Sequence, residues 1–597
     1  MQSPDRFADH LVDILVKRGF THCFYLAGGN SMHLLEASRN VFQCIPFVHE
    51  VSAVIAAENF NLSSSHKAWV LVTAGPGVTN TITGMAGAWL ESHGVVVVGA
   101  QVKSTDIGVD SGFRQFGIQE IDGVAAAGPF CKESMRLSSE TSCSQVADLV
   151  DLSADGRPGP VFLEVPIDLS AAPWGCSTES HIARLDNNSS LSHGQLDAFS
   201  DDVIRALESA SRPLFLIGQG CSRGGAFSLA ADLLEKSVPI ATSWSGADRV
   251  GTDLKNYVGR PNFFGMRSSN LIVQKCDLLV TIGARLGLQQ TGFNVEAFAP
   301  NAEIISVDID VKEMSKRPFR SISIEADTAE FLEAFLPKLA LADLNQSGDW
   351  LSHCMRLRDS FPNDLYGTDA VSDGINPYAF MEAVSELCDE RELLVSCSSG
   401  GTFTAFMQAF RNRSGQQIFS NKGLASMGYG LASGIGVALA NPGRRVLLFE
   451  GDGGFAQNMQ ELGTVIKQRL PITMFLFDNG GYASIKSSQR RFFGGDHIGC
   501  DSATGLGMPD WSRLASAYGL DYVSLPKLGW RPILKSALAS LGPTLVRIPV
   551  DPEFEYAPKI LSEMTPDGAI ISNPLHVMHP EIADPKLLKL AGTYIDG

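Results

Sequence analysis

The feature that most constrains this chain is a repeated alternation of short apolar runs, rich in β-branched residues, with longer amphipathic stretches. A buried strand of a parallel sheet is a continuous apolar run, and the helix that leads to the next strand has a period of 3.6 residues. The alternation therefore predicts an α/β protein in which mainly parallel sheets are flanked by helices. At 597 residues the chain is too long for one core, so several domains are expected.

Changes in composition divide the apolar runs into three blocks. The segment SAAPWGCSTESHIARLDNNSSLSHG (170–194) is rich in Ser, Pro, Gly and Asn, as interdomain linkers are. The periodicity weakens again over 341–375, which indicates a second connection. We therefore predict an N-terminal domain over 1–175, a central domain over 195–342, a C-terminal domain over 372–555 and an arm over 556–597.

Net charge and the chain's opening restrict its partners. The formal charge of -18 disfavours nucleic acid and anionic membranes, which would repel the protein. No apolar run reaches the roughly 18–20 residues needed to span a bilayer. The opening MQSPDRFADHLVDILVKRGF is charged throughout and lacks the order of a secretory signal. We expect a cytoplasmic protein that acts on small molecules.

An acidic residue held between glycines follows one apolar run. In RRVLLFEGDGG, Asp452 comes directly after the expected strand, at the carboxyl end where open α/β sheets bind ligands. Gly451, Gly453 and Gly454 let the backbone approach a bulky anion, and the next helix adds its positive N-terminal end. The pattern is typical of a diphosphate site; the alternative is a tight turn between strand and helix.

A second polar residue follows the next apolar run, ITMFLFDNGGY. Asn479 should lie at the same sheet edge as Asp452, because both strands are expected to be parallel. Mg²⁺ prefers oxygen ligands, and Asp452, the Asn479 side chain and the Gly481 carbonyl could supply three. The paired strand ends favour a metal and diphosphate site over two unrelated turns.

This pair of strand ends resembles the cofactor motif of thiamine-diphosphate-dependent enzymes, although the family's frequent Asn-Asn is Asp478-Asn479 here. The segments IPFVHEVSAVIAAENF and VLVTAGPGVTNTITGMAGAWLES resemble the same family. The resemblance implies that Glu50 hydrogen-bonds the pyrimidine ring of the cofactor and activates it. Taken alone, Glu50 would be a helix-start residue favoured by the helix dipole.

The resemblance also implies cofactor contacts in both outer blocks. The GPG segment would shape the pyrimidine pocket, and NKGLASMGYGLASGIGVAL places a methionine where the family has an apolar wedge between the two cofactor rings. A methionine there is otherwise core filling. Outside the GDGG turn, the implied contacts are Gly75, Pro76, Gly77, Asn80, Gly401, Thr402, Ala425 and Met427.

The resemblance extends over essentially the whole chain and is strongest to the acetolactate-synthase-like branch. AGGNSMHLLEA, FRQFGIQEID and RLGLQQTGFN look most like members from sugar and polysaccharide pathways. It implies that Gln119 lies near the reacting carbon and that Gly29 faces the thiazolium ring. Asn30 and His33 are candidate substrate contacts, although polar loop residues more often form turns or caps.

The implied activity is decarboxylation of a 2-oxo acid such as pyruvate, followed by carboligation to a second carbonyl compound. The cofactors would be thiamine diphosphate and Mg²⁺, in an active site at the subunit interface of a homodimer or homotetramer. Adjacent His-His pairs, typical of simple pyruvate decarboxylases, are absent, which favours carboligation. A non-ligating decarboxylase, a C–C lyase and a noncatalytic binding or regulatory subunit stay open.

The glycines of LIGQGCSRGG in the central block raise one more cofactor question. A strand followed by glycines can bind a dinucleotide, and some relatives carry FAD on this domain. The spacing here is loose. We therefore expect an ordinary turn at this position rather than FAD.

Overall fold

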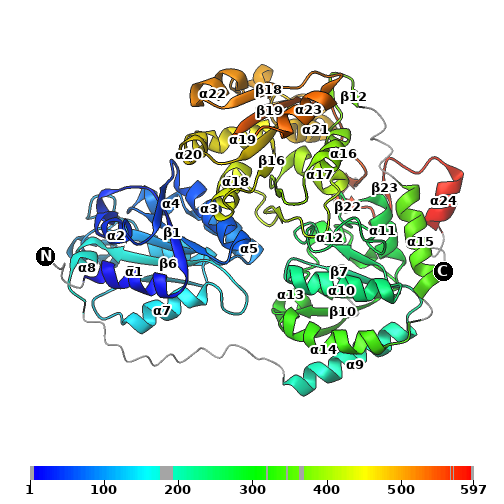
Figure 1. The fold of residues 1–597 in the computed structure, drawn as a ribbon, viewed down its shortest axis with the longest axis horizontal. Helices are drawn as coiled ribbons and strands as arrows, with labels where there is room; N and C mark the ends of the chain where they lie inside the picture. The colour runs from blue at the N-terminus through cyan, green and yellow to red at the C-terminus, as the bar shows by residue number, and fades with distance from the viewer. Residues whose placement is uncertain are drawn as a thin grey trace. The chain divides into compact units, whose positions relative to one another are not determined.

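The computed structural model describes residues 6–174, 192–316, 321–344, 347–361, 369–564, 567–568 and 570–592. Three sheets, each flanked by helices, follow one another along the chain (Figure 1). The predicted fold class is confirmed. The chain forms two compact units: one combines residues 6–174, 391–402 and 419–549, and the other contains the remaining described residues.

The first sheet is parallel and has the strand order β2-β1-β3-β4-β6-β5. Alternate residues of its central strands point into two cores, with Val97 in one and its neighbours Val96 and Val98 in the other. Its strands are β1 (Phe20–Tyr25), β2 (Gln43–Pro46), β3 (Lys67–Val72), β4 (Val96–Gln101), β5 (Glu133–Arg136) and β6 (Val161–Pro166). Its helices are α1 (Phe7–Lys17), α2 (Met32–Ser38), α3 (Glu50–Ser63), α4 (Pro76–Thr79), α5 (Ile82–Glu91), α6 (Gly123–Ala127), α7 (Cys143–Leu152) and α8 (Ile167–Ala171).

The third sheet has the order β15-β14-β16-β17-β19-β18, and apart from Ile418 it belongs to the same unit as the first. Its strands are β14 (Leu393–Ser396), β15 (Ile418–Phe419), β16 (Val446–Gly451), β17 (Ile472–Asp478), β18 (Asp521–Ser524) and β19 (Thr544–Pro549). Its helices are α17 (Gly400–Ala409), α18 (Tyr429–Ala440), α19 (Asp452–Asn458), α20 (Leu462–Gln468), α21 (Ala483–Phe492), α22 (Trp511–Tyr518) and α23 (Trp530–Leu538).

Helices α3 and α18 join the first and third sheets (Figure 1). A Cβ added to Gly436 of α18 would clash with the backbone of Ala56 in α3, so the two helices approach as closely as glycine permits. The Nδ2 atom of Asn59 donates a hydrogen bond to the Tyr429 hydroxyl at 2.8 Å. One continuous apolar core contains residues from both sheets.

The central sheet, in the second unit, is parallel with the order β11-β10-β9-β7-β8. Its strands are β7 (Pro213–Ile217), β8 (Ile240–Thr242), β9 (Leu278–Ile282), β10 (Glu303–Asp308) and β11 (Ser321–Glu325). The helices before, within and after it are α9 (His193–Ser209), α10 (Arg223–Glu235), α11 (Arg267–Lys275), α12 (Leu288–Thr291), α13 (Val311–Ser315), α14 (Thr328–Leu341), α15 (Ser347–Ser360) and α16 (Pro377–Leu387).

The glycines after β7 allow two loops to pack against each other. A Cβ on Gly218 would clash with the Gly283 carbonyl, and one on Gly220 would lie 2.9 Å from the Gly283 Cα. These glycines therefore have a structural role in the central domain. The expected absence of FAD stays a prediction.

The two predicted interdomain connections can be compared with the structure only in part. Most of the 170–194 linker lies outside the described residues. The second connection, 341–375, contains the 14-residue helix α15 (Ser347–Ser360). The sequence did not predict this helix, because its apolar periodicity is weak. The arm contains the short strands β20 (Lys559–Ile560), β21 (Ser562–Met564), β22 (Ile570–Ser572) and β23 (Met578–His579), and the helix α24 (Pro585–Gly592). Among the helices described, none has the length and apolarity to cross a membrane.

Candidate functional site

The candidate site is built around Asp452, the first residue of α19, at the carboxyl end of β16. Its side chain is 1% exposed, and its carboxylate accepts hydrogen bonds from the backbone N–H groups of Gly453 and Gly481, each at 2.8 Å. Burial and the nearby Asp478 carboxylate raise the pKa of Asp452 to about 7. The backbone supplies only part of the positive potential that a buried carboxylate needs, and a bound cation would supply the rest.

Asn479 and Gly481 lie beside Asp452 because β16 and β17 are parallel neighbours, with Gly451 opposite Phe477. The Oδ1 atom of Asn479 is buried and has no hydrogen-bond partner. Gly481 has φ +140°, and a Cβ there would clash with the Cys500 carbonyl, so only glycine suits the position.

The residues present fit a hard divalent cation. Among the described residues, no group of three or more His, Cys, Asp and Glu side chains could hold a metal. An ion at Asp452 would therefore be bound by one carboxylate, the orphaned amide oxygen of Asn479, a backbone carbonyl and oxygens of a ligand. Mg²⁺ bound together with a diphosphate has this kind of ligand set.

Position 478 is an aspartate where the family frequently has an asparagine, and nearby donors compensate its negative charge. The Nε atom of Arg547 donates to Asp478 Oδ2 at 2.5 Å, and the backbone N–H of Gly480 donates to Oδ1 at 3.3 Å. The extra negative charge thus has its own cationic partner on β19. Asp478 still acts on the site, because its charge contributes to the raised pKa of Asp452.

The glycines after Asp452 are required by close packing. A Cβ on Gly453 would lie 2.6 Å from the ring of Tyr482, and one on Gly454 would clash with the carboxyl of Glu450. Glu450 is buried, and burial raises its pKa to about 8, so at neutral pH it is mostly uncharged. Gly451 approaches Thr402, which is buried near the start of α17 next to Gly401.

The turn that carries Ala425 and Met427 is fastened to the end of α19. Ala425 has φ +57°, an uncommon conformation for a residue with a Cβ. The Nδ2 atom of Asn458 donates to the Gly428 carbonyl at 2.7 Å, and Gln457 Nε2 lies 3.7 Å from the Met427 sulfur. The predicted wedge residue is therefore connected to the helix that begins at Asp452.

The predicted activating residue, Glu50, is the first residue of α3. The Nδ2 atom of Asn80 donates a hydrogen bond to Glu50 Oε2 at 3.0 Å. Asn80 directly follows α4, the short helix of the GPG segment, so two separately predicted motifs meet here. Within the described residues, no hydrogen bond links Glu50 to Asp452.

The GPG turn also meets the predicted Gln119. Gly75 has φ +66°, and a Cβ there would lie 2.6 Å from the Gln119 carbonyl oxygen. Pro76 is the first residue of α4, and Gly77 packs against Thr73. Gln119 itself has φ +67°, so its conformation is strained and must be held by its surroundings.

Glu120, which sequence reasoning missed, fixes the loop that leads to Gln119. Its side chain is 1% exposed, and its two oxygens accept four backbone N–H groups at 2.6–2.9 Å. These hydrogen bonds lower the pKa of Glu120 to about 2, against the opposing effect of its desolvation. The only sequence signal was an acid in a glycine-rich loop. The four donors are Gly108, Val109, Phe116 and Gly117.

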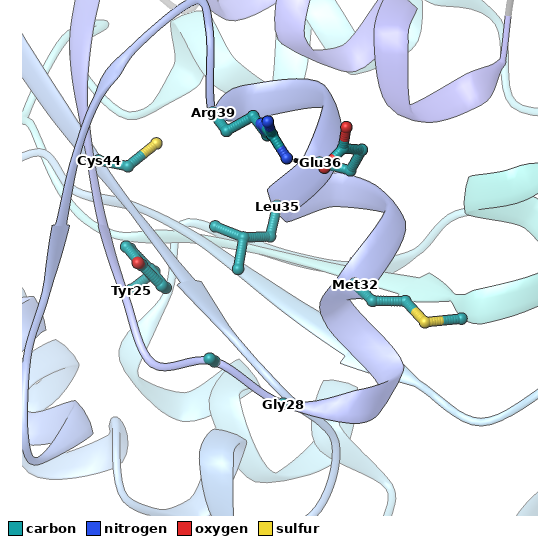
Figure 2. Close-up of a pocket in the computed structure, with 8 residues that line it drawn as sticks. Tyr25, Gly28, Met32, Leu35, Glu36, Arg39 and Cys44 are labelled. Atoms are coloured by element: carbon teal, nitrogen blue, oxygen red, sulfur yellow. Dashed lines mark hydrogen bonds and ion pairs between the residues drawn. The ribbon is translucent and has the colours of Figure 1, made fainter. Parts of the chain in front are cut away.

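The loop with the predicted substrate contacts borders a cavity of about 570 Å³ (Figure 2). Gly29 is exposed and Asn30 is half-buried in the single 3-10 turn Gly29–Ser31, and His33 is half-buried in α2. None of these three residues lines the cavity, and neither do Glu50 and Asp452. The lining residues are Tyr25, Ala27, Gly28, Met32, Leu35, Glu36, Arg39 and Cys44.

Comparison with known proteins bears on all three sheets. Residues 5–126 match the thiamine pyrophosphate enzyme N-terminal TPP binding domain, and residues 200–335 match the central domain of the same family. Residues 399–548 match its C-terminal TPP binding domain. The three matches follow the family's order and together cover most of the chain.

Similar proteins extend over nearly the full length. The acetolactate synthase isozyme 2 large subunit of Escherichia coli (strain K12) is 29% identical over 84% of this chain and 88% of that protein. The isozyme 1 large subunit of the same organism is 27% identical over 94% and 96%, respectively. The acetolactate synthase large subunit of Porphyra purpurea is 28% identical over 91% of each chain.

Proposed function

Because the chain belongs to the thiamine pyrophosphate enzyme family, we propose that it decarboxylates a 2-oxo acid such as pyruvate and ligates the remaining acyl unit to a second carbonyl compound. The product would be a 2-hydroxyketone. Similarity to acetolactate synthase large subunits over most of the chain supports this reaction. The observation that carries the proposal is that Glu50, bonded to Asn80, and the Asp452 site with its orphaned Asn479 oxygen are retained together.

The proposed cofactors are thiamine diphosphate and Mg²⁺. The Asp452 carboxylate, Asn479 Oδ1 and the Gly481 carbonyl would hold the ion, whose remaining positions would go to diphosphate oxygens. Ala425 and Met427 would contact the ring system. The raised pKa of Asp452 supports a cation there, because a positive charge would stabilise the buried ionised carboxylate.

When bound, thiamine diphosphate supplies a thiazolium ring that stores the electron pair released as CO₂ leaves. The chain's own contribution to proton movement is Glu50. Its Oε2 accepts a hydrogen bond from Asn80, which fixes the carboxyl and leaves Oε1 to hold or release a proton toward the pyrimidine ring. We expect Glu50→Gln to abolish turnover while largely sparing cofactor binding.

Exclusion of water would favour ligation over release of an aldehyde. A water-poor site favours decarboxylation, because it disfavours the substrate carboxylate relative to the charge-dispersed transition state.

Three apolar side chains near Gln119 are strongly exposed in the single chain: Phe113 at 61%, Phe116 at 68% and Ile118 at 88%. We propose that a second copy of the chain covers them in a homodimer or homotetramer. Full activity of a sedimenting monomer would contradict this part of the proposal.

The deciding experiment is a matrix of 2-oxo acid donors against aldehyde, ketone and keto-sugar acceptors, read by mass spectrometry with Glu50→Gln as the control. A product that contains both substrates, formed by the wild type and not by the variant, is expected. An aldehyde as the only product would favour a simple decarboxylase instead. Cofactor binding without any turnover would favour a noncatalytic binding subunit.

A further inference from the structure

The first unit has two halves: residues 6–174 around the first sheet, and residues 391–402 with 419–549 around the third sheet. Two buried glutamates connect these halves, because each accepts hydrogen bonds from the backbone of the other half. Glu461 ends the 3-10 turn Met459–Glu461 that follows α19, and it is 0% exposed. Its Oε1 atom accepts hydrogen bonds from the backbone N–H groups of His49 at 2.9 Å and Val48 at 3.1 Å. Its Oε2 atom accepts one from the Thr464 hydroxyl at 2.7 Å.

Glu91 makes the reciprocal contact. It is the last residue of α5 in the first half and is 5% exposed. Its Oε1 atom accepts the backbone N–H of Lys422 at 2.7 Å and also that of Gly423. A Cβ on Gly423 would lie 2.9 Å from the Leu90 Cβ, so the segment is pressed against the end of α5.

Each held segment lies immediately before residues proposed to contact the cofactor. Val48 and His49 precede Glu50, and the segment 422–423 precedes Ala425 and Met427. A buried carboxylate that accepts two successive backbone N–H groups fixes both the position and the direction of the chain, because charge-assisted hydrogen bonds are short and strong.

The burial of these groups argues against a role in stability alone. Burial raises the pKa of Glu461, and the hydrogen bonds from Thr464, His49 and Val48 oppose that rise. Well-packed apolar residues often stabilise a core as well as a buried charge does. The glutamate adds directional hydrogen bonds to the backbone at Val48 and His49, which apolar packing does not supply.

We propose that Glu461 and Glu91 are positioning residues: Glu461 sets the place of Glu50 from the diphosphate-binding half, and Glu91 sets the place of the Ala425–Met427 turn from the pyrimidine-binding half. The inference rests on the proposed function of Glu50. Each cofactor-binding half of the chain is thereby held by a side chain of the chain's other half. Neither glutamate would touch substrate or cofactor.

The main test compares the same substitution at two glutamates. Glu50→Gln should abolish turnover, because the amide cannot exchange a carboxyl proton. Glu461→Gln keeps an acceptor oxygen for His49 and Val48, so it should retain kcat within about threefold. Glu461→Ala removes the acceptor and should lower kcat about 100-fold, the usual effect of misplacing a catalytic group by about 1 Å. Its thiamine diphosphate Kd, from calorimetry with Mg²⁺, should stay within about threefold.

Substitution of Glu91 should change the Kd for thiamine diphosphate and leave kcat nearly unchanged. Glu91→Ala should raise the Kd for thiamine diphosphate by about 10-fold or more, a typical effect of removing a group that orients a ligand-binding residue. Its kcat at saturating cofactor should stay within about threefold. Glu392→Ala is the matched control, because the buried Glu392 pairs with Arg445 at the starts of the neighbouring strands β14 and β16. It should leave both quantities unchanged.

A second measurement does not depend on the alanine variants folding. In the cofactor-free wild type, the amides of Val48 and His49 should exchange hydrogen at least about 100-fold slower than unprotected amides, and faster in Glu461→Gln. Unprotected amides in the wild type would overturn the inference. So would a folded Glu461→Ala with wild-type kcat, or a Glu461→Gln as inactive as Glu50→Gln. If Glu50→Gln itself remains active, the proposed function fails instead.

Discussion

Glu120 and Asp452 are both 1% exposed carboxylates in the same unit, yet their surroundings differ sharply. Glu120 accepts four backbone N–H groups, and its pKa is lowered to about 2. Asp452 accepts two, lies near Asp478, and has a pKa raised to about 7. The fold supplies the first carboxylate with all its hydrogen-bond partners, whereas we propose that a cation completes the surroundings of the second.

The difference separates a carboxylate that shapes a loop from the carboxylate that we propose binds a cation. At Glu120 every hydrogen bond serves to shape the loop that carries Gln119. Beside Asp452, the buried Oδ1 atom of Asn479 has no hydrogen-bond partner, so an unsatisfied oxygen lies next to a carboxylate at one sheet edge. Buried polar groups are normally satisfied. This edge is therefore best explained as half of a binding site.

Of the substitutions considered, Asp452→Asn should cause the largest change in cofactor affinity. Removing the charge should weaken Mg²⁺-dependent binding of thiamine diphosphate by more than about 100-fold, beyond the 10–100-fold typical of outer-shell changes. The free energy of unfolding of the cofactor-free protein should stay unchanged or rise, because a poorly compensated buried charge is lost. Calorimetry and urea unfolding measure the two quantities. Unchanged affinity would remove the distinction between the two carboxylates.

Glu120→Gln should lower the stability of the fold and largely spare cofactor affinity. An amide offers one acceptor oxygen where the carboxylate has two, so about two of the four N–H donors lose their partner. The free energy of unfolding should fall by about 3 kcal/mol, as measured by urea denaturation. Thiamine diphosphate affinity should change much less than in Asp452→Asn. A stability loss below about 0.5 kcal/mol would mean that the loop is held by other contacts.

Asn479→Ala should affect binding without affecting stability. Its Oδ1 atom has no partner in the folded chain, so the free energy of unfolding should change by less than about 0.5 kcal/mol. Binding of thiamine diphosphate with Mg²⁺ should weaken by about 10-fold. Gly480→Ala is an unsuitable control because Gly480 has φ +80°, whereas Ser484→Ala on the neighbouring α21 leaves the sheet edge intact. Wild-type affinity in Asn479→Ala would exclude this oxygen as a ligand.

The pH dependence of stability gives the smallest expected effect. The pKa of Glu120 is about 2 in the folded protein and 4.5 ordinarily, so the unfolded state binds more protons between these values. The stabilisation by Glu120 is therefore complete above about pH 4.5 and is lost as the pH falls toward 2. The stability difference between wild type and Glu120→Gln should shrink from pH 7 to pH 4. A difference that grows on acidification would contradict the lowered pKa.

The sequence predicted features that depend on local pattern, and missed those that depend on distant contacts. Apolar runs and strand-end polar residues were sufficient to predict parallel sheets and the adjacency of Asp452 and Asn479. The contact of Glu461 with His49 joins positions far apart in the chain, so no spacing rule indicates it. Glu120 reads as an ordinary loop acid, because its four donors are backbone groups and leave no residue signature.

The most direct test is a calorimetric titration of thiamine diphosphate into the cofactor-free wild-type protein, once with Mg²⁺ and once with a chelator. We predict saturable binding with Mg²⁺ and at least about 100-fold weaker binding without it, because Asp452 and Asn479 can reach the diphosphate only through a cation. Absence of saturable binding with Mg²⁺, or equal affinity in the chelator, would contradict a cation-completed site at Asp452.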